Sequence, residues 1–122
     1  MNSYPVRWAG RRAVVTLPDE IDVTNAAQVG AALGQALQDG ATVIIADMTG
    51  TTFCASDGVK ALIDARTTAA AAGVQMRVAG VAPGSAVGRV LELLAAGQLL
   101  DLYPSLDAAL AGQQYPGANS EN

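Results

Sequence analysis

The sequence predicts an α/β fold, in which a mixed sheet of four to five strands with a parallel core is flanked by about four helices. Two observations support this prediction. Short apolar runs alternate along the chain with segments whose apolar residues recur at helical spacing, which is the pattern of βαβ crossovers. The run TVIIADM at 42–48 is apolar almost throughout, as expected of a strand that is covered on both faces.

The N-terminal part of the chain predicts a hairpin at the edge of the sheet, because short extended runs at 6–8 and 13–17 surround a turn at Gly10. A helix then begins at Thr24 or Asn25, and either side chain can cap it by accepting a backbone N–H bond. A second helix starts within the segment TTFCASDGVK and runs into an alanine stretch of high helix propensity. The other expected elements are a strand over 74–79, a helix opened by Pro83 and Ser85, an extended piece over 99–103 and a helical turn over 105–110.

Length and composition predict one domain in a reducing compartment. The chain has 122 residues, of which 1–111 are assigned to a single domain and 112–122 to a disordered polar tail. The seven basic residues are scattered and the net charge is −4, which argues against binding to nucleic acid or to an anionic membrane surface. No stretch is long and apolar enough to insert across a bilayer. A single cysteine cannot form an internal disulfide, so the cytoplasm is the expected location.

Few catalytic chemistries are open to this composition. The chain has no histidine and one cysteine, which excludes Ser-His and Cys-His catalysis and most zinc sites. Asp47 looks like the phosphoacceptor of a receiver domain, but that site also needs an acidic pair after an early strand and a lysine near the last strand, and the one lysine is Lys60. No short loop supplies alternating carboxylates for calcium. We therefore expect no enzyme activity, no cofactor and no metal site.

The segment TTFCASDGVK holds the residues that are most promising for function. A helix that starts at Asp57 makes Ser56 its N-cap and exposes the hydroxyl at the edge of the sheet. A phosphate there would meet free backbone N–H groups and the positive end of the helix dipole. It would also lie close to Asp57 and, by topology, near Asp22, so it would repel a partner bound on that face. Cys54 is expected to pack inward as an inert thiol rather than to act as a redox sensor.

Three segments, in this order, resemble STAS domains, specifically the bacterial anti-sigma-factor antagonists. Asp19 to Asp22 and the helix that follows resemble the Gly-Glu-Leu-Asp signature of these proteins. The segment TVIIADMTGTTFCASDGVKALI looks like their phosphorylation segment, in which a strand and an aromatic residue precede Asp-Ser-Ser/Thr/Ala-Gly-Leu/Val. The stretch from Gly73 to Leu110 is similar to their strand, helix and C-terminal end. The resemblance covers roughly residues 4–111.

The resemblance implies a switch without enzyme activity of its own. In this family the unphosphorylated antagonist binds an anti-sigma factor and frees the sigma factor. The anti-sigma factor is also a serine kinase that uses its own bound ATP, and a phosphatase resets the switch. Carried over residue by residue, the phosphoacceptor falls on Ser56, the family's glycine on Gly58 and its acidic residue on Asp22. The chain is expected to be a monomer or a weak dimer. The residues expected to contact the partner are Asp22, Thr24, Asn25, Ser56, Asp57, Gly58 and Lys60.

Three positions depart from the family pattern. Ala55 stands where a carboxylate usually precedes the serine, Asp57 where a small or hydroxyl residue follows it, and Asp19 where the signature begins with glycine. Asp57 either preserves the local negative potential or partly mimics phosphoserine; we favour the first, because a carboxylate lacks the three acceptor oxygens of a phosphate. The competing hypothesis is a STAS subunit that does not switch, in a membrane lipid-transport complex or a stress-signalling scaffold, where Ser56 would only cap a helix.

Overall fold

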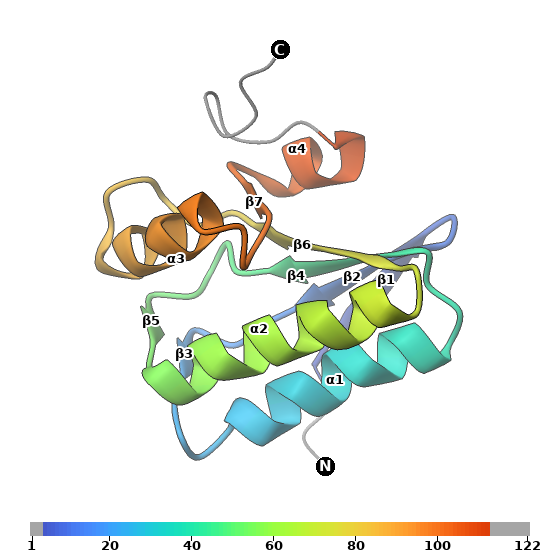
Figure 1. Cartoon of the computed structure of the whole chain (residues 1–122), viewed down its shortest axis with the longest axis horizontal. Coiled ribbons are helices and arrows are strands. Elements are labelled where there is room, and N and C mark those ends of the chain that lie inside the picture. Colours follow the sequence, from blue (N-terminus) through green and yellow to red (C-terminus); the bar gives the residue numbers. More distant parts are fainter. Residues whose placement is uncertain (1–3, 113–122) are drawn as a thin grey trace.

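The computed structural model describes residues 4–112, and they form one layered α/β structure (Figure 1). The helices are α1 (Ala26–Gln38), α2 (Ser56–Ala71), α3 (Ala86–Ala96) and α4 (Leu106–Ala111). The strands are β1 (Val6–Ala9), β2 (Arg12–Thr16), β3 (Glu20–Ile21), β4 (Val43–Asp47), β5 (Phe53–Cys54), β6 (Gln75–Ala79) and β7 (Leu102–Tyr103).

The main sheet has the strand order β1-β2-β4-β6-β7. β1 is antiparallel to β2, and the other neighbouring strands are parallel, so the predicted mixed sheet with a parallel core is confirmed. β3 and β5 form a separate parallel pair, which the sequence analysis did not predict. This pair lies beyond the carboxyl ends of β2 and β4, beside α3 and the start of α2 (Figure 1).

The central strand β4 is covered on both faces, as its apolar run predicts. Ile44 and Ala46 belong to the larger core, which they share with residues of α1 and α2. Ile45 belongs to a smaller core that contains Ala109 of α4. Figure 1 shows the same arrangement, with α1 and α2 side by side on one face of the sheet and α4 on the other.

Serine side chains begin the two C-terminal helices. The Ser85 hydroxyl accepts a hydrogen bond from the Gly88 N–H at 2.9 Å, and the Ser105 hydroxyl accepts one from the Ala108 N–H at 3.0 Å. Each bond satisfies one of the backbone donors that a helix start leaves without an intrahelical partner. The predicted helix opened by Ser85 is therefore confirmed, and the last helix begins at the residue after Ser105.

Two arginines from the sheet hold the carboxyl end of α4. Arg12 Nη1 donates to the carbonyl of Leu110, and Arg77 Nη1 donates to the carbonyl of Ala109 at 2.6 Å. These are carbonyls that a helix end leaves unsatisfied, and a cation is favourable there. The predicted tail begins with Gly112, which ends α4 in a left-handed conformation; the rest of the tail, 113–122, lies outside the described residues.

Candidate functional site

The β3–β5 pair brings two segments that are distant in the sequence to one edge of the molecule. Ile21 pairs with Cys54, and the Ala55 N–H donates to the Ile21 carbonyl at 2.8 Å. Because the strands are parallel, the residues that follow them leave the pair on the same side. Asp22 and Ser56 are thereby placed at neighbouring strand ends, as the sequence analysis expected.

Ser56 is the first residue of α2 and is exposed. The prediction that it is the N-cap is wrong, because Ala55 has the extended backbone of the cap position (φ −75°, ψ 170°). The Ala55 carbonyl accepts hydrogen bonds from the N–H groups of Gly58 and Val59, which starts the helix one residue earlier than predicted. The Ser56 hydroxyl makes no hydrogen bond to any described residue, so it is not held by the fold.

Gly58 allows the first turn of α2 to lie close to the β3–β5 pair. A Cβ at this position would lie 2.5 Å from Ile21 Cγ2 and 2.8 Å from Cys54 Sγ. Only glycine allows the first turn of α2 to pack directly on the β3–β5 pair. The buried Gly58 thus fixes the position of the exposed residues on either side, Ser56 and Lys60.

Asp22 forms a tight turn with Thr24 at the end of β3. Its Oδ1 accepts hydrogen bonds from the Thr24 N–H at 2.9 Å and from the Thr24 hydroxyl at 2.5 Å. The bond from the Thr24 hydroxyl is the main reason that the pKa of Asp22 lies below its ordinary value, and the bond from the Thr24 N–H adds to it. Asp22 therefore stays ionised at neutral pH and keeps a fixed negative charge beside Ser56.

Asn25 ties the start of α1 back to β3. It occupies the N-cap position, but neither it nor Thr24 caps α1 with its side chain, so the predicted cap is wrong. Instead, Asn25 Oδ1 accepts from the Asp22 N–H at 2.9 Å and Asn25 Nδ2 donates to the Glu20 carbonyl at 2.8 Å. The amide therefore bridges the two residues that flank Ile21 and holds the strand that positions Ser56.

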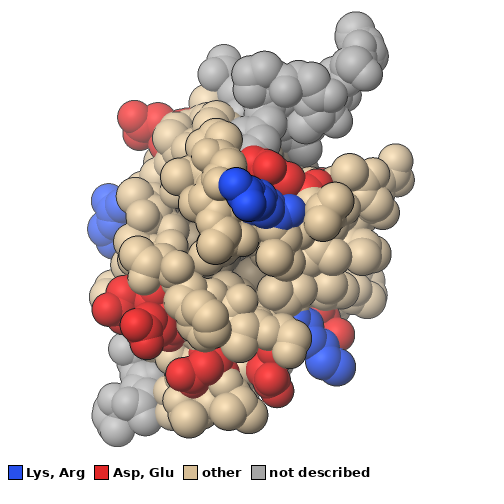
Figure 2. Space-filling view, turned by 90° about the vertical axis from the view of Figure 1, so that its left-hand side faces the viewer, with Lys and Arg blue, Asp and Glu red and all other residues tan. Residues whose placement is uncertain are grey.

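Acidic and apolar side chains surround the edge of the molecule at which the β3–β5 pair lies. Figure 2 looks at this side of the molecule and shows several acidic side chains in its lower half, next to surface that carries no charge. Val23, after β3, is 71% exposed and Phe53, in β5, is 51% exposed. The sequence analysis did not include these two residues, because two-residue strands have no alternating pattern that would reveal which side chains face solvent.

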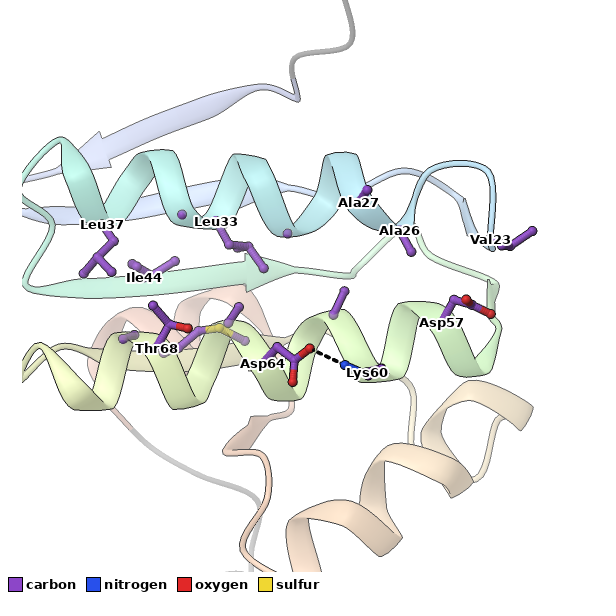
Figure 3. Close-up of a pocket in the computed structure, with 16 residues that line it drawn as sticks. Val23, Ala26, Ala27, Leu33, Leu37, Ile44, Asp57, Lys60, Asp64 and Thr68 are labelled. Atoms are coloured by element: carbon purple, nitrogen blue, oxygen red, sulfur yellow. Dashed lines mark hydrogen bonds and ion pairs between the residues drawn. The ribbon is translucent and has the colours of Figure 1, made fainter.

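Asp57 and Lys60 occupy the first turns of α2. The Lys60 ammonium donates to Asp64 Oδ2 at 2.8 Å, which raises the pKa of Lys60 (Figure 3). Both side chains of this pair are largely exposed, so the pair contributes little stability. Asp57 forms no ion pair with a described residue. The positive charge nearest to Ser56 along the helix is therefore engaged with Asp64, while the Asp57 carboxylate is available to another molecule.

The side chains of Cys54 and Asp47 contribute to the structure and not to a reactive site. Burial raises the pKa of Cys54 to about 11, which keeps the thiol protonated and agrees with the expectation of an inert thiol. Asp47 Oδ1 accepts from the Thr49 N–H at 3.0 Å and from the Thr49 hydroxyl at 2.5 Å, so this carboxylate closes a turn.

Within residues 4–112, His, Cys, Asp and Glu side chains form no cluster of three that could bind a metal ion. Over the same range, no helix has the length and apolarity needed to cross a membrane.

Comparison with known proteins identifies the family. The STAS domain model matches residues 6–109. The chain belongs to the STAS domain family. This confirms the resemblance found in the sequence. The anti-sigma-F factor antagonist RsfB of Mycobacterium tuberculosis is a STAS relative that is 30% identical over 100 residues, which are 82% of this chain and 80% of RsfB.

Solved structures confirm the STAS fold. An anti-sigma factor antagonist from Mycobacterium paratuberculosis superposes with a TM-score of 0.77 at 25% identity, covering 90% of this chain and 92% of that protein. The phosphorylated form of SpoIIAA from Bacillus superposes with a TM-score of 0.67 at 19% identity, covering 90% of this chain and 98% of that protein.

Proposed function

We propose that this chain is an anti-sigma-factor antagonist that is switched by phosphorylation of Ser56. The observation that supports this best is the exposed Ser56 hydroxyl, which has no hydrogen-bond partner among the described residues and stands at the first position of α2. RsfB, the relative from M. tuberculosis, is an anti-sigma-F factor antagonist. The chain acts by binding and has no enzyme activity of its own. The proposed contact residues are Asp22, Thr24, Asn25, Ser56, Asp57, Gly58 and Lys60.

The partner is an anti-sigma factor that is also a serine kinase with bound ATP. In the transfer step, Ser56 Oγ attacks the γ-phosphorus, and the bond from that phosphorus to the β,γ-bridging oxygen breaks. The hydroxyl proton passes to a base of the kinase, and ADP remains on the partner. A phosphatase later hydrolyses the phosphoserine and resets the switch.

Phosphorylation releases the partner through charge. A phosphoserine carries about −1.5 to −2 at neutral pH. It would face the phosphates of the ADP left on the partner and would stand near the acidic side chains of Asp22 and Asp57. The single ammonium of Lys60, which is paired with Asp64 in the unmodified chain, is too little positive charge to offset the phosphate together with Asp22 and Asp57. We propose that Asp57 supplies the carboxylate missing at position 55 and does not act as a phosphate mimic.

The test is to incubate the purified chain with ATP and each anti-sigma kinase of its own organism, and to locate phosphate by mass spectrometry. We expect phosphate on Ser56 and none on Ser56→Ala, which should still bind the kinase. Ser56→Glu should bind about tenfold more weakly. Asp57→Ala should weaken binding, and adding Ala55→Asp to it should recover part of that loss.

Three results would each contradict a part of the proposal. If a kinase binds the chain tightly and Ser56 is never modified, the switch is wrong, although the binding role stands. If no anti-sigma factor binds, the antagonist role itself is wrong. Weaker binding of the unaltered chain than of Asp57→Ala would show that Asp57 holds the switch partly off.

A further inference from the structure

A groove of about 460 Å³ runs between α1 and α2 and starts beside the proposed phosphorylation site. We call it the α1–α2 groove. Val23 and Asp57 lie at one end of it, and Leu37 and Thr68 lie towards the other (Figure 3). The first and last residues of α1 that line it are Ala26 and Leu37, which are about 16 Å apart at 1.5 Å per residue.

The walls of the groove are too short to fill it. Its floor includes the buried Ile44 and Met76 of the sheet, and its sides are mostly apolar. Most of the residues that the two helices contribute to the lining are small. They are Ala26, Ala27, Gly30 and Gly34 of α1 and Ala61, Ala65 and Ala69 of α2, and the larger apolar side chains that α1 adds are Leu33 and Leu37.

The two glycines are not required by packing inside this chain. A Cβ added at Gly30 or Gly34 would meet no described heavy atom within 4 Å beyond its own helix backbone and chain neighbours. Alanine would therefore fit at both positions, and it is the better helix former in the middle of a helix. Gly58 and Gly88, by contrast, would clash with their surroundings if they carried a Cβ. Glycine at 30 and 34 keeps space open for something that approaches the α1 backbone closely.

The charges at the rim indicate the chemistry of the occupant. Asp57 and Asp64 supply two carboxylates, and Lys60 supplies one ammonium that is already paired with Asp64. The uncompensated charge is that of Asp57, next to Ser56. An apolar segment that carries one cation near its end would match both the apolar groove and this carboxylate.

We propose that the α1–α2 groove binds an apolar helix of the anti-sigma partner, with a Lys or Arg of that helix on Asp57. This inference rests on the proposed function, since it extends the same partner contact from Ser56 along α1 and α2. The groove is elongated, about three helical turns long, which suits the apolar face of a helix. The glycines let the two helix backbones come close together.

The test uses the anti-sigma factor that binds the unaltered chain and compares substitutions inside and outside the groove. Gly34→Leu fills the groove and should weaken binding about tenfold or more. Ala31→Leu adds the same side chain to the exposed side of α1, outside this groove, and should leave binding unchanged. Gly30→Ala with Gly34→Ala should raise the Tm by about 5 °C and yet weaken binding severalfold. If the two glycines had only a structural role, the double alanine variant would change stability and binding in the same direction.

Several outcomes would overturn the inference. Unchanged binding by the double alanine variant would do so even if Gly34→Leu fails to fold. A small apolar molecule that co-purifies with the chain and is lost in Gly34→Leu, seen by native mass spectrometry, would assign the groove to a ligand. A dimer in sedimentation that Gly34→Leu abolishes would assign it to a second copy. If the unaltered chain binds no anti-sigma factor, the proposed function fails as well, which the groove variants alone cannot cause.

Discussion

Two turns of this molecule have the same local structure and different surroundings. In Asp22-Val23-Thr24 and in Asp47-Met48-Thr49, the aspartate Oδ1 accepts hydrogen bonds from the threonine N–H and hydroxyl, with distances that agree within 0.1 Å. Both turns follow the carboxyl end of a parallel strand. The middle residue differs, because Met48 is 0% exposed and Val23 is 71% exposed.

The comparison separates what a short motif determines from what the fold determines. Asp-x-Thr produces the turn in both places through bonds within three residues. The neighbouring segments decide whether the middle side chain is covered. After β4 it is enclosed in the larger core, and after β3 it is left in solvent beside the proposed partner face. The first turn is therefore expected to matter for binding and the second for stability.

The largest expected effect is at Gly80, which packs against the buried turn. A Cβ at Gly80 would lie 2.2 Å from Thr49 Oγ1 and 2.8 Å from Thr49 Cα, and its φ is +87°. Gly80→Ala should lower the free energy of unfolding by about 3 kcal/mol or more in urea denaturation. Gly84→Ala is the matched control, with φ +80° and no neighbour within 4 Å of the added Cβ, and should cost only about 1 kcal/mol. Equal losses would show that backbone strain alone accounts for Gly80.

The next largest effect is expected from alanine substitutions at the middle residues of the two turns, Met48 and Val23. Met48→Ala removes a fully buried side chain and should destabilise the chain by about 2–4 kcal/mol. Val23→Ala should change stability by less than about 0.5 kcal/mol and should weaken binding to the anti-sigma factor. Thermal unfolding and a binding titration on the same samples measure both. A loss of stability in Val23→Ala similar to that in Met48→Ala would contradict the distinction between the two turns.

The smallest expected effect is a change in the pH dependence of stability. The pKa of Asp22 is lower in the folded chain than its ordinary value, so its ionisation stabilises the fold above pH 4. This contribution is lost as the pH falls below 4 and through the folded-state pKa. Asp22→Asn should therefore be less stable than the unaltered chain at pH 7, with a difference that shrinks below pH 4. A difference in unfolding free energy that stays constant over this range would exclude the effect.

Local chemistry in the sequence was enough to predict much of the fold. The buried strand that ends at Asp47 and the helix that Ser85 opens are determined by residues close together in the chain. Both elements were predicted correctly. The β3–β5 pair was missed because each strand has two residues and the pairing joins Ile21 to Cys54, far along the chain. No periodicity within either strand signals such a contact.

In the candidate site, too, local features were predicted and contacts between distant segments were missed. Ser56 was selected from the segment around it, but the start of its helix was predicted one residue too late. Serine is favoured at an N-cap, yet the Ala55 carbonyl accepts the hydrogen bonds from the Gly58 and Val59 N–H groups, so the cap is Ala55. The α1–α2 groove was not predicted, because it depends on the separation of two helices rather than on either helix alone.

The arginines that hold α4 have a consequence for the order of assembly. A helix of six residues does not persist by itself in water. Its last carbonyls are bound by Arg12, 98 residues before Leu110, and by Arg77, 32 residues before Ala109. Both arginines reach α4 only when β2 and β6 are already placed in the sheet. We therefore expect the C-terminal helix to form late in folding, after the strands that carry the two arginines have paired.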